Sequence, residues 1–160
     1  MIDCRSVCGN IDIYHSTILA IDPSGAPAID GGSVRRIRVV ASSFVGVTDA
    51  PFVSLDAVQA TFIDDNWFQP GGAGPVDIAG SLLDIDALDA CAFTGCTGSA
   101  RNTSDDPLSG LDATLPLASP LVAAGVDAIA AGAPTSVVLD LLGDCRFLDG
   151  SADIGASEYP

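Results

Sequence analysis

The sequence predicts an all-β fold built as a solenoid, in which short strands stack coil upon coil. Four nine-residue blocks, at residues 11–19, 37–45, 55–63 and 76–84, each begin with an apolar, a polar and an apolar residue. This alternation places the first and third side chains on one face of a strand. The block starts are 26, 18 and 21 residues apart, a spacing typical of solenoid repeats.

The connections between the blocks are rich in turn residues, at 22–27, 30–32, 49–51 and 69–75. With 17 Gly and 10 Pro in the chain, long helices are disfavoured. One coil cannot bury its apolar face alone, so the blocks are expected to stack. The residues predicted to face inward are Ile11, Ile13, Ile37, Val39, Leu55, Ala57, Val76 and Ile78.

The C-terminal segment contains two short patterns. Residues 119–125 read Ser-Pro-Leu-Val-Ala-Ala-Gly, and residues 139–159 carry spaced Asp, Gly and Arg residues followed by Asp-Ile-Gly-Ala at 153–156. In order and spacing, these patterns resemble the closing segment of secreted right-handed parallel β-helix proteins, a group that includes bacterial choice-of-anchor and polymorphic outer-membrane proteins. One position departs from that family, because Ala124 stands where an Asp is usual.

The resemblance implies an all-β, right-handed parallel β-helix (solenoid) with a C-terminal capping segment. It implies one domain, with about four coils over residues 1–90 and with a loop excursion and the cap over residues 91–160. A fold of this kind supports many functions, so the resemblance bears on architecture more than on activity. The cap residues would be Asp140, Gly143, Arg146, Asp153, Gly155 and Glu158.

The first block begins only ten residues into the chain, and no recognisable cap precedes it. Residues 1–5 also lack the basic and then apolar order of a signal peptide. We therefore expect a C-terminal part of a longer protein, or a coil that stacks on a partner. No apolar run approaches the roughly 18 residues of a membrane-spanning helix, so no membrane insertion is expected.

The chain is strongly acidic, with a formal net charge of -15, six Arg and no Lys. Nucleic acid is excluded as a partner, because such binding draws its affinity from cations that neutralise phosphates. Asp side chains suit turns and also suit calcium sites in loops. Asp84, Asp86 and Asp89 are the candidate calcium ligands, and no other cofactor is expected.

Five cysteines include two closely spaced pairs, Cys4 with Cys8 and Cys91 with Cys96. Each pair could form a disulfide in an oxidising compartment, which fits a secreted or cell-surface bacterial protein. The same four thiols could alternatively bind zinc, although nothing else resembles a zinc-binding module. Cys145 lies in the closing segment.

The residues for polysaccharide cleavage are sparse. Asp64 and Asp65 could form an acid and base pair of the kind that glycosidases use. However, the chain has no Lys, and its single histidine, His15, is expected to point outward from a strand. We therefore expect no enzymatic activity in this chain.

A weak carbohydrate-binding surface is the remaining candidate site. Trp67 and Phe68 could stack on sugar rings, and Arg35 and Arg36, which cluster with Arg38, could bind an acidic sugar. The expected partners are thus a polysaccharide, another protein, or a second copy at the N-terminal coil.

The sequence as a whole predicts a non-catalytic structural or adhesive part of a secreted or surface-displayed bacterial β-helix protein. Two alternatives stay open. The chain could be the C-terminal fragment of a carbohydrate-active β-helix whose site lies upstream, or a self-assembling subunit that stacks through its N-terminal coil.

Overall fold

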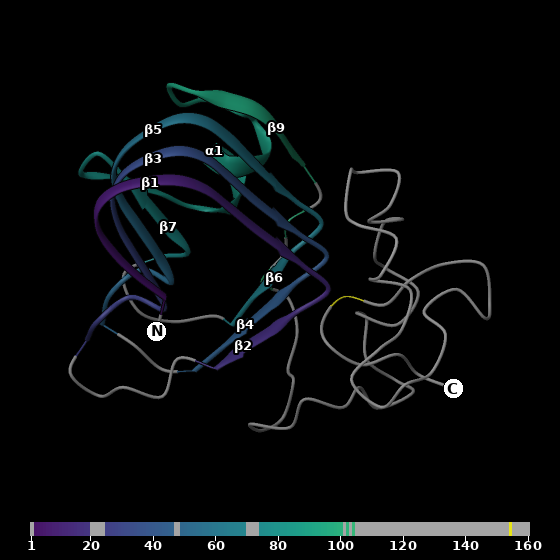
Figure 1. Ribbon diagram of the computed structural model, residues 1–160. Helices are drawn as coiled ribbons and strands as arrows, with labels where there is room; N and C mark the ends of the chain where they lie inside the picture. Colours follow the sequence, from purple (N-terminus) through teal and green to yellow (C-terminus); the bar gives the residue numbers. More distant parts are fainter. Residues whose placement is uncertain are drawn as a thin grey trace, which may run out of the picture.

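A computed structural model describes residues 2–19, 25–46, 49–69 and 74–100, together with residues 102, 104 and 154. These residues are mostly strands, arranged in two sheets (Figure 1). The helix among them, α1 (Ile85–Asp89), has five residues. No helix in this part of the chain is long and apolar enough to span a membrane.

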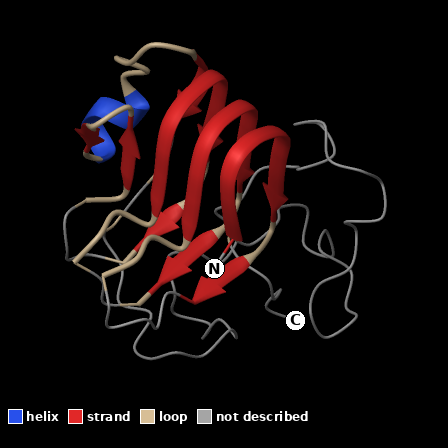
Figure 2. Ribbon diagram, turned by 60° about the vertical axis from the view of Figure 1, so that its left-hand side comes forward, coloured by secondary structure: helices blue, strands red, loops and turns tan. Residues whose placement is uncertain are grey.

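The larger sheet is built on three long strands, β1 (Ile2–Tyr14), β3 (Ile29–Val40) and β5 (Val53–Asp64). They pair in parallel and curve beside one another (Figure 2). The sheet continues from β5 to β7 (Val76–Ile78) and β8 (Ser81–Leu83), while β9 (Cys96–Ala100) pairs with β5 off this path. The second sheet is parallel and contains β2 (Thr17–Leu19), β4 (Ser43–Val45) and β6 (Trp67–Phe68).

The right-handed parallel β-helix predicted from the sequence is wrong, because the described residues form mixed parallel and antiparallel sheets and no solenoid. The strand β7 pairs in parallel with β5 over three residues and then folds back onto β8 as an antiparallel hairpin. Its two-residue loop has φ 55° at Ala79 and 77° at Gly80. Two successive positive φ values are typical of the type I′ turn, which matches the twist of a hairpin. The chain then enters α1, and β9 follows it and pairs in parallel with β5.

The register also differs from the predicted alignment of the blocks. Ile37 pairs with Ile11 on one side and with Thr61 on the other, whereas the block alignment placed Leu55 in that position. Residues 76–84, predicted as a fourth copy, instead form the β7–β8 hairpin. The loop excursion predicted from residue 91 contains β9, a strand of the larger sheet.

The core lies between the two sheets, where three aromatic rings meet. The rings of Phe44 and Phe68 stack with their centroids 4.8 Å apart, and Phe52 is tilted against both. Leu88 of α1 is fully buried in the same core. Among the residues predicted to face inward, Ala57 is exposed, Ile11 and Ile13 are half-buried, and five are buried: Ile37, Val39, Leu55, Val76 and Ile78.

Candidate functional site

The chain bends sharply where each long strand of the larger sheet leads into a short strand of the second sheet. The bends are at His15, Ala41 and Asp65, whose φ angles are 42°, 49° and 61°. Left-handed backbone is unfavourable for residues with a side chain and persists where surrounding contacts hold it. Each bend is followed by a residue with a short polar side chain: Ser16, Ser42 and Asn66.

These polar residues form a continuous chain of hydrogen bonds, which we name the polar ladder: Ser16, Ser42, Asn66, Asn102 and Asp89. The backbone amide of Ser16 donates to Ser42 Oγ at 3.2 Å, and that of Ser42 donates to Asn66 Oδ1 at 3.0 Å. The amide of Asn66 donates to Asn102 Oδ1 at 3.2 Å, and that of Asn102 donates to Asp89 Oδ1 at 3.1 Å. At each step of the polar ladder, a side chain thus accepts a hydrogen bond from the backbone N–H of the preceding member.

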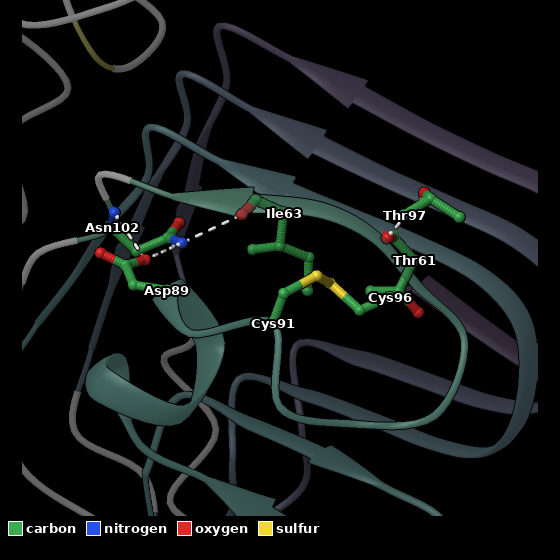
Figure 3. The surroundings of a disulfide bond; sticks show 7 residues. All are labelled: Thr61, Ile63, Asp89, Cys91, Cys96, Thr97 and Asn102. Carbon is green, nitrogen blue, oxygen red and sulfur yellow. Dashed lines mark hydrogen bonds between the residues drawn. A yellow bond between two sulfur atoms is a disulfide. The ribbon is translucent and has the colours of Figure 1, made fainter.

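The two asparagines also hold backbone carbonyls beside the bends. Asn66 Nδ2 donates to the carbonyl oxygen of Val39 at 2.9 Å, and Asn102 Nδ2 donates to that of Ile63 at 2.9 Å (Figure 3). Asn102 Nδ2 also lies 2.7 Å from Asp89 Oδ1. An amide side chain both donates and accepts, so each asparagine can join an N–H and a carbonyl within one buried corner.

A disulfide joins Cys91, just after α1, to Cys96, the first residue of β9 (Figure 3). This is one of the two pairs that the spacing suggested. The loop that it closes lies against β5, because the amide of Thr61 donates to the carbonyl of Gly95 at 2.8 Å and Thr97 Oγ1 donates to the carbonyl of Thr61 at 2.9 Å. The side chains of Cys4 and Cys8, and all of Cys145, lie outside the described residues.

The three Asp residues proposed as calcium ligands have separate roles. Asp84 is the N-cap of α1, and its carboxylate accepts from the amide of Ala87 at 2.8 Å. Asp86 is exposed in the first turn, and Asp89 accepts from Asn102. Within the described ranges, no group of three or more His, Cys, Asp or Glu side chains is placed to hold a metal ion.

The Asp64–Asp65 pair and His15 lie at the bends. His15 and Asp65 are 3% exposed, so the expectation that His15 points outward is wrong. The two occupy the same place in successive layers as Ala41, whose amide donates to the carbonyl of Asp64 at 3.2 Å. An alanine fills this position as well, so the bend itself needs no titratable side chain.

Trp67 and Phe68 lie in the interior and offer no aromatic surface to a sugar. Phe68 packs inside the core against Phe44, and Trp67, on the opposite face of the second sheet, is fully buried with Val45 and Ile154. Stacking on a sugar ring requires an exposed ring face, so the interpretation of this pair as a binding surface is wrong. Of the predicted closing segment, only Ile154 is described. The six cap residues, Asp140, Gly143, Arg146, Asp153, Gly155 and Glu158, lie outside the described residues.

The arginines of β3 lie on an outward face of the larger sheet. Arg36 forms an ion pair with Asp12, with its Nη2 2.6 Å from Oδ2 and its Nε 3.3 Å from Oδ1. The hydrogen bond to Asp12 is the main reason why the pKa of Arg36 is raised. Arg35 is exposed. The predicted binding residues Arg35 and Arg36 are therefore accessible, unlike the two aromatic residues proposed with them.

Phe62 is a member of this face that the sequence did not single out. The guanidinium carbon of Arg38 lies 5.8 Å from the centroid of the Phe62 ring, a cation–π distance. We name Arg36, Arg38 and Phe62 the cationic face. Strand alternation could have identified Phe62 in the sequence. It lies between Thr61 and Ile63, which are buried, and so points away from the core.

Comparisons with known proteins give no match to a family model, to a curated protein or to a solved structure.

Proposed function

We propose that this chain is a non-catalytic structural module of a secreted or surface-displayed bacterial protein, one that keeps a stiff β framework in place and presents an outer face for adhesion. The observation that carries the proposal is the polar ladder. Its buried side chains are used to bind backbone amides and carbonyls of neighbouring layers.

The ladder supports a framework role because parallel layers joined only by main-chain bonds can slip or separate at the bends. Buried backbone groups that lose their partners are costly, by about 1–3 kcal/mol each. The side chains of Asn66 and Asn102 tie together the bends at Ala41 and Asp65 and the end of α1, so separating one layer would leave such groups unpaired.

The disulfide between Cys91 and Cys96 supports placement outside the cytoplasm. Disulfides persist in the periplasm, at cell surfaces and in secreted proteins, and are rare where thiols are kept reduced. The acidic composition, with a net charge of -15, fits a protein that must stay dispersed.

Two titratable side chains support the same role: Asp65, which the sequence suggested as one half of an acid and base pair, and His15, the single histidine. A general acid or base must reach the proton that it transfers. Asp65 and His15 are buried at bends, and the equivalent bend uses an alanine. These positions are explained by the conformation of the chain without assigning them a reaction.

The test is an assay of turnover on the full chain after export to an oxidising compartment. Pectin, alginate and polygalacturonate should yield neither new reducing ends nor unsaturated products. Turnover that is lost in Asp65→Asn or Asp64→Asn but kept in Asp56→Asn would refute the proposal, because Asp56 is an exposed carboxylate on the same strand, β5, as Asp64. Circular dichroism of each variant shows whether a loss of turnover reflects a loss of fold.

A further inference from the structure

Half of the positive charges of this chain lie within four residues of one strand. The chain has six Arg and no Lys against 21 acidic residues, and three of the six Arg are at positions 35, 36 and 38 of β3. The acidic residues alone would give the chain enough net charge to stay dispersed in solution. A cluster of cations in such a chain therefore calls for a local reason, and a negatively charged ligand is one that electrostatic complementarity favours.

The register of the larger sheet arranges this cluster into rows. In the backbone register of the sheet, Arg38 lies opposite Asp12 of β1 and opposite Phe62 of β5. Phe62 in turn lies opposite Gly98 of β9. Arg36 and Arg38 are two positions apart on β3, about 7 Å along the strand, and point to the same side. The face thus presents two guanidinium groups beside an aromatic ring.

Two residues lie close to the Phe62 ring, Arg38 and Gly98. Arg38 lies over it at 5.8 Å, and the ring lies so close to β9 that a Cβ atom at Gly98 would be 2.6 Å from Phe62 Cε2. Glycine at position 98 therefore allows the ring to lie close against the backbone of β9. A half-buried ring fixed in this way offers a defined apolar edge next to the arginines.

We propose that the cationic face is a binding site for a carboxylate-bearing polysaccharide, such as a uronate chain. A planar guanidinium binds a carboxylate through two parallel hydrogen bonds. The Phe62 ring, which Arg38 covers on one face, adds an apolar edge beside the guanidinium groups and no face for stacking. The structure contains an internal example, because the Asp12 carboxylate binds Arg36 through both Nε and Nη2. This inference rests on the proposed function in one respect, the extracellular setting in which such polymers occur.

Asp12 then acts as a competitor for the ligand. The ion pair is exposed, with the Arg36 and Asp12 side chains 36% and 32% accessible, so a ligand carboxylate can displace Asp12 from Arg36. Removing the Asp12 charge should therefore strengthen binding, whereas removing Arg36 or Arg38 should weaken it. A site made only of scattered surface charge would not respond to Asp12 differently from any other acidic residue.

The experiment measures binding of polygalacturonate and alginate to the full chain by isothermal titration calorimetry. Fully methyl-esterified pectin is the neutral sugar control, and polyglutamate and polyphosphate are the anions without sugar rings. We expect Arg36→Gln and Arg38→Gln each to lower the affinity about tenfold, the loss of one charge-assisted contact. Phe62→Leu should lower the affinity for the uronate polymers while leaving the weak binding of polyglutamate unchanged.

Asp12→Asn should raise the affinity several-fold, and Asp49→Asn is its matched control. Asp49 is exposed in the loop before β5, so this change alters the net charge equally without touching Arg36. An equal effect of the two variants would overturn the site, since only the net charge would matter. Binding of methyl-esterified pectin, polyglutamate or polyphosphate as tight as that of polygalacturonate would overturn the ligand class.

Failure of this inference is distinguishable from failure of the proposed function. Absence of binding with no turnover would refute the cationic face as a polysaccharide site and leave the structural role standing. Binding accompanied by cleavage of the polymer would refute the non-catalytic role while supporting the site. Thermal unfolding of each variant identifies any loss of affinity that comes from unfolding.

Discussion

The substitution Asn66→Ala is the strongest test of the polar ladder. The side chain of Asn66 is fully buried, accepts from the amide of Ser42 and donates to the carbonyl of Val39. Alanine removes both bonds and leaves the two backbone groups inside the corner. It also removes a third bond, from Asn66 Nδ2 to the carbonyl of Asp64 at 3.0 Å, but that carbonyl still accepts from the amide of Ala41. The contact of Asn66 Nδ2 with Asn102 Oδ1 at 3.1 Å is lost as well.

The expected magnitude follows from the groups left behind. A buried backbone group that loses its partner costs about 1–3 kcal/mol, and two such groups give about 4 kcal/mol. The stability of a whole domain is about 5–15 kcal/mol, so a large share would be lost. For a chain of 160 residues, each kcal/mol lowers the melting temperature by roughly 2–4 °C, which predicts a fall of about 10 °C.

Urea unfolding followed by the fluorescence of Trp67, the single tryptophan, measures this loss. Asn10→Ala is the matched control, because Asn10 is exposed on β1 and the same atoms are removed there. Exposed substitutions away from special contacts change stability by about 0.5 kcal/mol or less. Unfolding free energies of the two variants within about 1 kcal/mol of each other would refute the argument, since the corner groups would then find other partners.

Two more changes test the segment from α1 to β9. Replacing Cys91 and Cys96 together by Ser should lower the free energy of unfolding by about 2 kcal/mol, because the unfolded chain regains the entropy of a loop whose ends are 5 residues apart. A reduced and an oxidised sample with the same midpoint in urea would contradict this. Gly95→Ala should destabilise the chain by about 2 kcal/mol more than Gly80→Ala. Both glycines have positive φ, 86° and 77°, so the backbone strain of an alanine is similar at the two positions. A Cβ at position 95 would lie 3.1 Å from a backbone carbonyl oxygen, whereas one at position 80 would meet nothing within 4 Å. Equal thermal midpoints of the two variants would show that the contact at position 95 relaxes freely.

Strand alternation predicted which segments are extended, but it did not predict the register. The blocks at 11–19 and 37–45 fall on paired strands, and Ile11 does pair with Ile37. The third block failed because β5 is twelve residues long and its burial alternates near both of its ends. A period of two allows either Leu55 or Thr61 to lie opposite Ile37, because the two residues are an even number of positions apart. Alternation alone therefore cannot choose the partner of Ile37.

Two short local features interrupt the parallel pairing between β7 and β9. The Ala79–Gly80 turn reverses the chain, and Asp84 then caps a helix of five residues. A helix of this length has too few residues for a helical period to be visible. The predicted coil at 76–84 therefore rested on three apolar positions that a hairpin satisfies as well as a coil does.

The buried aromatic pair illustrates a different limit. Alternation places Phe68 toward the core and Trp67 on the other face, where Ile154 lies against it. Nothing near Trp67 in the sequence indicates that a residue so far along the chain covers its ring. The face of the second sheet that carries Trp67 is buried by this long-range contact and forms a second, smaller core.

The bends show how the place of a residue in the fold changes the meaning of its chemistry. His15, Ala41 and Asp65 hold the same left-handed position in three layers, although one is basic, one is apolar and one is acidic. A histidine and a carboxylate seen alone in the sequence indicate acid and base chemistry. Once they align with an alanine, the shared property is the backbone conformation, and the residue that follows each bend carries the bonding. The groups suited to bind a ligand therefore lie on the cationic face, where the Arg36 charge is accessible and its partner Asp12 can be replaced by a ligand carboxylate.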